Sequence, residues 1–550
     1  MSRREAIASA GLIFVVALAV RVVAASLVVF PMPEDTAYYV EVARAFVGGR
    51  GLVADALWSY QTPPLIVPRP AFEVWLPLPT FLSALPMALL GATFAAAQVA
   101  PVIVGAIVPV LAWRLAADVA EELRLPPGRA RTLAVGTGLT CAVYLPLLLH
   151  SVLPDSTMPF AALALGACLL MTRLVESVRE ASGMAARAVA MTDPRLLGLG
   201  LLLGLAALTR NEAVWLALVW ALLAWSMRGR SAGERIGLIA VPAVVALLVF
   251  APWAIRDWAV FGTPLPGQAL TNALSIRGED IFAWSDPPTL ARYLAVGPQR
   301  LIEMRVQGIG HNLLNVLLVP GAPLSVIGLI ALPWSVALRS LRPVVALSAL
   351  TFVATSLLFP VATTWGTFLH AAGPVHVLLV ISSLVGLDRL IAAIGDRRRW
   401  TRPVAWLAPA LTMSGAALFA AVFLPAFGLG SRETADRYRA LDQQLAAAGM
   451  PLATLGPVIT DFPIWMAMTS GGSSLALPDE PPSSVLDLAR SFPGTHTLIV
   501  DGGSDRMWPG ILDAGGPGTE CFQEVKLAPP ADPTLVAAVK GTRVFRLVCP

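Results

Sequence analysis

Two adjacent carboxylates, Glu34 and Asp35, come directly after the first long apolar run of the sequence, residues 7–30. Acidic residues are scarce in this chain, with 35 Asp and Glu among 550 residues. A carboxylate at the edge of a bilayer is expensive to bury, so it is a candidate for function. Its place beside lipid suggests chemistry on a lipid-borne substrate.

Other polar side chains stand at the ends of later apolar runs, on what the span assignment below makes the outer rim. Arginine binds phosphate oxygens in a bidentate manner and keeps its charge. A carboxylate can take a proton from an attacking hydroxyl, and fixed cations stabilise a departing phosphate. The rim residues that suit such chemistry are Asp35, Arg69, Asp155, Arg210, Arg256 and His370.

Each of these residues also has a structural interpretation. Glu34 and Asp35 could be hydrated acids at a helix N-terminus, where acids are favoured, and Asp155 could cap the next helix. The three arginines could reach to lipid headgroups, and His370 could be a hydrogen-bonding packing residue. The functional interpretation depends on their convergence on one face.

The composition is that of a membrane protein. The chain is 56% hydrophobic and 13% charged, with a mean hydropathy of +0.72, whereas soluble proteins carry roughly 25% charged residues. Only Lys526 and Lys540 among the 39 basic residues are lysines, and the arginines cluster in short loops. That distribution is an orientation signal and argues against a nucleic-acid partner.

Eleven apolar runs are long enough, or nearly so, for a span of roughly 20 residues, and we expect an uncleaved first helix with a cytoplasmic N-terminus. The segment 72–93 is also apolar but contains Pro77, Pro79 and Pro86, so we expect it to lie along the outer interface or to re-enter. With 72–93 not crossing, the inner loops hold 19 arginines and the outer segments before residue 428 hold 9. The expected spans are 7–30, 95–117, 131–149, 156–175, 196–210, 212–227, 236–254, 312–334, 343–360, 371–392 and 403–427.

The tail differs in character from the apolar part. We expect an α-helical polytopic membrane domain over residues 1–427 and a small extracytoplasmic α/β domain over residues 428–550. Residues 432–447 are typical of an amphipathic helix, and the short strands expected in the tail are 456–460, 497–501 and 542–548. Cys521 and Cys549 flank two of these elements, and an oxidising compartment permits a disulfide between them, although sequence gives no geometry.

The ordered motifs resemble those of the GT-C class of integral membrane glycosyltransferases, nearest to the lipid A aminoarabinose transferases and protein O-mannosyltransferases. The resemblance covers roughly residues 25–400. The family stretch D-E-x-x-Y-x-E-x-x-R is similar to Asp35 through Tyr39 and Glu41 to Arg44, with Thr36 at the second acid and Glu34 before the first. Further similar runs are Arg69–Pro70 with Trp75, Asp155, Gly204 to Arg210, and Pro252 to Pro264. The late R-[FY]-x-x-P-x-x-P motif is absent, and Thr367 to Pro374 stands in its place.

The resemblance implies a GT-C-like fold and transfer of a sugar from a polyprenyl-phosphate donor, outside the cytoplasmic membrane, to an unidentified protein, lipid or envelope-glycan acceptor. It implies a single inverting displacement with Asp35 as general base and Asp155 orienting the acceptor or sugar. Membrane lipid is a further partner. No His or Cys cluster with ligand spacing is visible, so no cofactor is assigned, although a divalent metal is compatible. The residues implied in binding the lipid phosphate or sugar are Glu34, Tyr39, Arg69, Arg210, Arg256 and His370.

Two other functions explain part of the pattern. A flippase or transporter for a polyprenyl-linked glycan would use acids and arginines in a bundle, but transporters often carry inverted repeats and midplane sites, and no repeat is visible here. A non-catalytic receptor or scaffold leaves the lipid-facing acid and arginine set unexplained.

Overall fold

A computed structural model describes residues 2–180, 193–400, 404–501 and 506–549. Seven helical stretches among these residues are long and apolar enough to cross a membrane. They are α1 (Arg3–Leu27), α4 and α5 (Phe94–Ala97 and Val99–Glu122), α8 (Thr157–Glu180), α12 (Ala232–Phe261), α17 (Arg342–Leu358) with the 3-10 turn before it, α19 (Gly373–Arg398) and α20 (Leu407–Ala447).

Shorter apolar helices complete the bundle, and each of the eleven expected runs contains a helix. They are α3 (Leu78–Leu90), α6 (Pro127–Val143), α7 (Leu145–His150), α10 (Pro194–Ala207), α11 (Ala213–Trp225) and α16 (Leu324–Ser335). With 13 residues, α3 is about 20 Å long and is shorter than the roughly 30 Å hydrocarbon layer. The helices α10 and α11 are similarly short, so the number of crossings stays a prediction.

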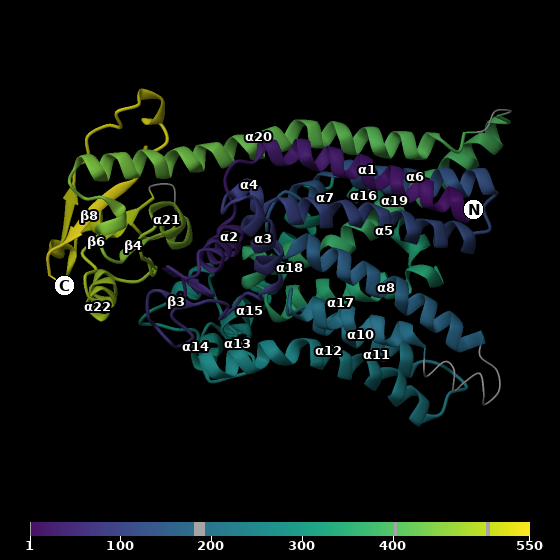
Figure 1. The fold of residues 1–550 in the computed structure, drawn as a ribbon, viewed down its shortest axis with the longest axis horizontal. Helices are drawn as coiled ribbons and strands as arrows, with labels where there is room; N and C mark the ends of the chain where they lie inside the picture. Colours follow the sequence, from purple (N-terminus) through teal and green to yellow (C-terminus); the bar gives the residue numbers. More distant parts are fainter. Residues whose placement is uncertain (1, 181–192, 401–403, 502–505, 550) are drawn as a thin grey trace.

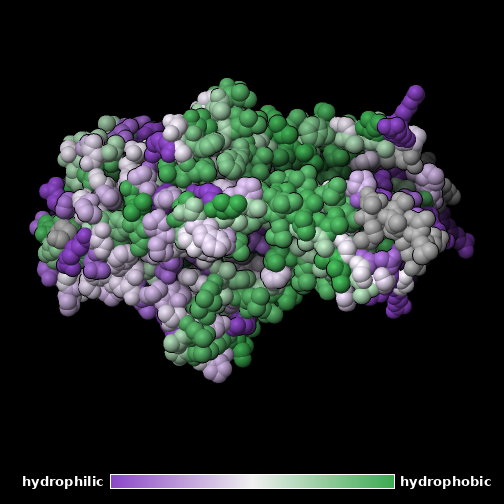
Figure 2. Space-filling view, turned by 60° about the horizontal axis from the view of Figure 1, so that its bottom comes forward, coloured by the Kyte–Doolittle hydropathy of each residue, from purple (hydrophilic) through white to green (hydrophobic). Residues whose placement is uncertain are grey.

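Small residues allow the helices of the bundle to approach closely. A Cβ added at Gly200 or Gly204 of α10 would lie 2.6 Å from the Cβ of Val245 or Val249 on α12. Such contacts replace the hydrophobic driving force, which is weak between helices surrounded by lipid. Figure 2 shows the outer surface of the bundle as an apolar band between two more polar ends, and the side chains of Leu247, Leu248 and Leu418 on this surface are more than half exposed.

One end of the bundle is covered by the C-terminal part of the chain (Figure 1), and we call this the capped end. The connecting segments at this end form several short helices. The loop after α1, residues 28–77, is called the first loop, and residues 262–289 are called the long loop. The helices at the capped end are α2 (Glu34–Val47), α13 (Ala269–Leu274), α14 (Leu290–Ala295), α15 (Gly297–His311) and α18 (Thr367–Ala371); α15 runs into a π-helical turn, Asn312–Leu318.

Residues 451–549, the C-terminal α/β region, contain most of a six-stranded sheet in the order β2-β5-β4-β6-β8-β7. The first four strands in this order are parallel, and β8 runs antiparallel to β6 and β7. The helix α20 continues to Ala447, so the expected boundary after residue 427 lies inside one helix. The elements are β4 (Val458–Thr460), α21 (Pro463–Ser470), β5 (Ser474–Ala476), α22 (Pro482–Ser491), β6 (Thr497–Val500), α23 (Gly510–Ala514), β7 (Phe522–Val525) and β8 (Arg543–Leu547).

The edge strand β2 (Ala56–Leu57) comes from the first loop and not from the tail. Two further strands of the first loop, β1 (Val53–Ala54) and β3 (Arg69–Pro70), pair antiparallel with each other. The first loop therefore contributes to the sheet of the C-terminal α/β region, a long-range pairing that the local sequence pattern did not indicate.

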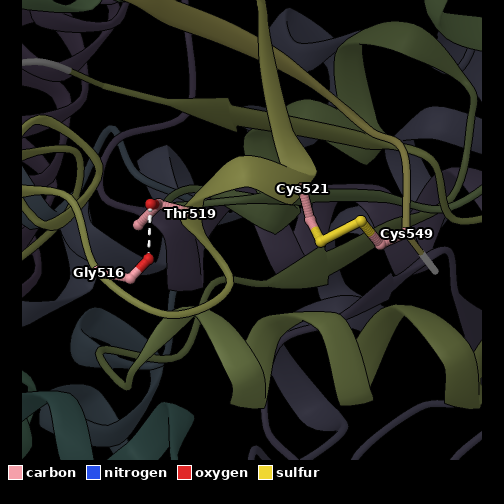
Figure 3. Close-up of a disulfide and its surroundings, with 4 residues drawn as sticks. All are labelled: Gly516, Thr519, Cys521 and Cys549. Atoms are coloured by element: carbon pink, nitrogen blue, oxygen red, sulfur yellow. Dashed lines mark hydrogen bonds between the residues drawn. A yellow bond between two sulfur atoms is a disulfide. The ribbon is translucent and has the colours of Figure 1, made fainter.

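Cys521 and Cys549 form a disulfide (Figure 3) that joins the start of β7 to the residues after β8. The Thr519 hydroxyl donates to the carbonyl of Gly516 in the turn beside it, at 2.8 Å. The other two cysteines, Cys141 and Cys168, are free and buried in the bundle.

Candidate active site

The first turn of α2 carries Asp35 at the capped end of the bundle. A carboxylate is favoured there because the first N–H groups of a helix lack intrahelical partners. Oδ1 of Asp35 accepts a hydrogen bond from the Thr36 amide at 2.8 Å, and Oδ2 lies 2.6 Å from Nε2 of His370. The Asp35 side chain keeps 16% of its surface exposed, so a substrate can reach it.

His370 lies in α18, the short helix before α19, and its ring is buried. One ring nitrogen faces Asp35. The other, Nδ1, lies 2.8 Å from Oγ1 of Thr157 and 3.6 Å from Oδ2 of Asp155. The imidazole therefore lies between the two aspartates that the sequence singled out.

Asp155 lies in the turn between α7 and α8. Oδ1 accepts a hydrogen bond from the Thr157 amide at 2.8 Å, so Asp155 does cap the start of α8. Oδ2 lies 3.0 Å from Nδ1 of His150, the last residue of α7. Asp35, His150, Asp155 and His370 thus form one connected group, which we call the Asp–His cluster.

The charges within the Asp–His cluster support each other. Burial lowers the pKa of His370, but the charge of Asp35 and the hydrogen bond to it raise that pKa above its usual value. Burial raises the pKa of Asp35, but the charge and hydrogen bond of His370 and the Thr36 amide bring it below its usual value. His370 therefore favours the ionised form of Asp35, the form that can accept a proton.

Arg210 lies beside the cluster, in the turn between α10 and α11. Its NH1 donates to the Ser156 hydroxyl at 2.8 Å, and its NH2 and Nε are paired with Glu212 at 2.7 and 3.0 Å. Tyr39 forms a side-chain hydrogen bond with the same Ser156. Arg210 contributes to the electrostatic environment of Asp35, so the structure brings Tyr39 and Arg210 to the cluster.

Glu34 points to a different part of the molecule, although it precedes Asp35. Its Oε1 accepts hydrogen bonds from the backbone amides of Ile464 and Trp465, at 3.0 and 3.3 Å, at the start of α21. Successive helical residues are about 100° apart around the axis, which explains why the two acids diverge. In this structure Glu34 contacts the C-terminal α/β region.

Arg69 is bonded within the first loop. Its guanidinium is 1% exposed and pairs with Glu73 at 3.1 Å, and it donates to the carbonyls of Ser59, at 2.8 Å, and Thr62. No contact between Arg69 and the Asp–His cluster is found in the parts of the chain that the structure describes. Its contacts join separate parts of the first loop, so Arg69 has a structural role here, which we call a brace.

Arg256, near the end of α12, pairs with Asp257 at 2.9 Å and stacks on Trp253, with the guanidinium carbon 4.8 Å from the ring centroid. Its side chain is 22% exposed. Arg256 has no contact with the Asp–His cluster among the described residues.

Sequence reasoning missed His150 and the role of Arg21. His150 stands five residues before Asp155 at the end of an apolar run, a spacing that could have pointed to it. Arg21 is fully buried in α1, where its Nε donates to the Ser151 hydroxyl at 2.9 Å and its NH1 donates to the carbonyls of Ala17 and Ala142. Arg21 therefore braces the turn that carries His150 and Asp155.

Three members of the cluster, His150, Asp155 and His370, offer ligand atoms that all lie within 4.8 Å of one another, and all three side chains are buried. Two imidazoles and one carboxylate are a donor set that Zn²⁺ accepts in catalytic sites. The residues present therefore fit a divalent cation, a cluster that the sequence spacing did not show.

Comparison with known structures identifies the fold of the chain. The chain superposes on ArnT from Cupriavidus metallidurans bound to undecaprenyl phosphate with a TM-score of 0.57, at 13% identity, covering 97% of each chain. It superposes on the apo oligosaccharyltransferase of Archaeoglobus fulgidus with a TM-score of 0.54, at 12% identity, covering 97% of this chain and 75% of the other. The chain has the GT-C fold.

The GT-C fold is shown by structure and not by sequence. No protein-family model matches the chain, and no curated protein matches it by sequence. The Archaeoglobus fulgidus enzyme has also been solved in a complex with Zn and sulfate, and that structure has a TM-score of 0.52 to this chain, at 14% identity over 94% of it and 73% of the other. At these identities the similarity establishes the GT-C fold, and function must be argued from the site.

Proposed function

We propose that this protein is a membrane glycosyltransferase that moves a sugar from a polyprenyl-phosphate donor to an extracytoplasmic acceptor. The observation that carries the proposal is the 2.6 Å contact between Asp35 and His370 at the capped end of the bundle. An ionised, partly exposed carboxylate beside an apolar, lipid-facing helical bundle suits a base that acts on a lipid-linked substrate. The undecaprenyl phosphate complex of the structurally similar ArnT supports the donor class.

The reaction is a single displacement with inversion. The acceptor hydroxyl attacks the anomeric carbon of the sugar while its proton passes to Oδ2 or Oδ1 of Asp35. The bond between the anomeric carbon and the phosphate oxygen breaks, and its electron pair leaves with the polyprenyl phosphate. His370, held by Asp35 and Thr157, orients the carboxylate and keeps it ionised.

The cations near the cluster serve the departing phosphate. Arg210 lies beside Ser156 and Tyr39 at the cluster and is the main candidate for the phosphate contact, because a fixed cation stabilises developing negative charge. Asp155 positions both histidines. Arg256 remains a secondary candidate at the lipid-facing edge, and Glu34 and Arg69 act through the protein contacts described above.

A divalent cation would be held by His150, Asp155 and His370. Bound there, it would supply Lewis-acid stabilisation of the phosphate oxygens. The positions of Asp35 and Arg210 follow from the chain's own contacts.

We place the protein in the plasma membrane, with the N-terminus cytoplasmic and the C-terminal α/β region on the extracytoplasmic side. The arginine distribution supports this orientation, because arginines are enriched in the loops at the opposite end to the Asp–His cluster. A disulfide in the C-terminal α/β region is compatible with an oxidising compartment.

The test is a reconstituted transfer assay with purified protein, a panel of polyprenyl-phosphate sugars and envelope extract, monitoring release of polyprenyl phosphate. We expect Asp35→Asn to lose on the order of 100-fold or more of the wild-type rate. The matched control is Asp442→Asn, at an exposed position of α20, which should behave as wild type.

Wild-type rates for Asp35→Asn would refute the general-base assignment. Movement of labelled lipid-linked sugar across vesicles, without release of polyprenyl phosphate from any donor in the panel, would indicate a flippase instead.

A further inference from the structure

The first loop is attached to the C-terminal α/β region on both sides of the Asp35 position. Before Asp35, the indole Nε1 of Trp465 donates to the carbonyl of Pro31 at 2.9 Å. Immediately beside Asp35, Glu34 accepts the amides of Ile464 and Trp465. The first N–H groups of α21 would otherwise lack partners, so this contact joins the start of one helix to the start of another.

After α2 the same loop enters the sheet. The strand β2 pairs parallel with β5, and the Ser474 amide donates to the carbonyl of Asp55 at 3.1 Å. The Tyr60 hydroxyl donates to the carbonyl of Ala476 at 2.5 Å. The α2 helix is joined to this strand by Glu41, whose Oε1 accepts the Asp55 amide at 2.6 Å.

The carboxyl ends of the parallel strands, where doubly wound domains usually bind ligands, are occupied by contacts within the chain itself. Such domains bind ligands outside the carboxyl ends of parallel strands, where the strand order reverses. Here that place is at the ends of β4 and β6, where Asp461 accepts the Asp501 amide at 2.6 Å. The Arg506 guanidinium lies over the ring of Phe282 from the long loop, 4.5 Å from its centroid.

The long loop is hydrogen-bonded to the C-terminal α/β region. The Glu480 carboxylate accepts hydrogen bonds from the amides of Trp284, Ser285 and Asp286, at 2.9 to 3.1 Å. Acidic side chains thus join backbone amides in both directions across the interface. The contacts join the C-terminal α/β region to the first loop, which carries Asp35, and to the long loop, which is the arrangement of a scaffold and not of an open binding domain.

From these contacts we propose that the C-terminal α/β region positions the catalytic helix α2, and that Glu34 is the positioning residue that sets Asp35 against His370. This inference rests on the proposed function. The two adjacent acids divide the work, because Asp35 contacts the Asp–His cluster while Glu34 attaches the same helical turn to α21. Glu34 must supply an oxygen that accepts the two amides of α21, and this role does not require a charge.

The experiment compares Glu34→Ala and Glu34→Gln in the reconstituted assay, with Glu433→Ala, an exposed glutamate of α20, as the matched control. We expect Glu34→Ala to lower kcat at least about 10-fold, because small displacements of a reacting group are costly, with the donor KM unchanged. Glu34→Gln keeps an acceptor oxygen and should retain kcat within about twofold.

A second measurement does not depend on the reaction. Hydrogen–deuterium exchange of peptides covering residues 34–47 and 463–470 should become faster in Glu34→Ala but not in Glu34→Gln or Glu433→Ala. Unchanged exchange in Glu34→Ala would overturn the inference even if no transfer activity is found for wild type. Equal loss of activity in both Glu34 variants, or a change confined to KM, would also overturn it, because either result would assign Glu34 a direct role with substrate.

Discussion

At the scale of single residues, charged side chains of the first loop have two different roles: one is placed to react with a substrate, and another holds the loop together. Asp35 is partly exposed and in contact with His370, which lowers the pKa of its carboxyl. Arg69 is the family-like cation of the same loop, yet it is 1% exposed and its two terminal nitrogens are bonded to protein groups. Burial decides the difference, because a buried cation needs a partner that an exposed one does not.

Replacing Arg69 tests this structural assignment. Arg69→Ala leaves Glu73 buried and unpaired, so we expect a loss of about 3–5 kcal/mol in the free energy of unfolding, measured in detergent. The double variant Arg69→Met with Glu73→Met removes both charges and should recover most of that stability.

The control for this pair is Arg439→Ala, which breaks an exposed ion pair with Asp436 and should change stability by less than about 1 kcal/mol. A stable, folded Arg69→Ala protein with weakened donor binding would contradict the brace and favour a phosphate contact for Arg69.

At the scale of elements, short helices at the capped end bring distant residues together. The helix α2 supplies Asp35, α18 supplies His370, and the turn between α7 and α8 supplies Asp155. Each of these elements is too short to be stable alone, so it depends on tertiary contacts. For α2 the contacts include Glu34 at the N-terminus of α21.

The Glu34 contact predicts a pH dependence of stability. Burial raises the pKa of Glu34 to about 8, while the α21 amides and Arg506 lower it and Asp35 raises it further; Tyr438 also lies near enough to be influenced by Glu34. The folded state therefore holds this proton more tightly than the unfolded state, whose glutamate has a pKa of about 4.3. Stability from this group is greatest below that value and falls as the pH rises towards about 8.

We expect the unfolding temperature of wild type to fall more steeply between about pH 4.3 and about pH 8 than that of Glu34→Gln, which cannot ionise. Parallel pH profiles for the two proteins would show that Glu34 is ionised in the folded state throughout that range.

At the scale of the whole molecule, the C-terminal α/β region is connected to the apolar bundle by shared elements. The β2 strand of the first loop lies at the edge of the C-terminal sheet, and α20 runs unbroken from the bundle to Ala447. Figure 1 shows this long helix along one side of the bundle and above the sheet. The two parts therefore share both a helix and a sheet.

The disulfide links β7 and β8 in the C-terminal α/β region. Cys521 and Cys549 are 28 residues apart, and a closed loop of that size contributes about 3.6 kcal/mol in the chain-entropy description. We expect the Cys521→Ser and Cys549→Ser double variant to show a lower unfolding temperature, and added reductant to have the same effect on wild type. A reductant effect that persists in the double variant would exclude the bridge as its cause.

The sequence by itself determined the membrane class, a helix in each of the long apolar runs, and the two aspartates that meet at the site. These features are local, because hydrophobic length and the position of an acid after an apolar run are visible without tertiary contacts. It also selected His370 and Arg210 as rim residues, and the family resemblance implied Tyr39. Only the tertiary structure joined His150 to Asp155 and separated Glu34 from Asp35.

The tertiary structure also decided which arginines are braces and which lie at the cluster, and it paired β2 with a strand more than 400 residues away. Such choices depend on burial and on contacts between distant segments. No local pattern encodes them, because the same arginine is stable at a lipid edge or in a buried ion pair, according to what surrounds it.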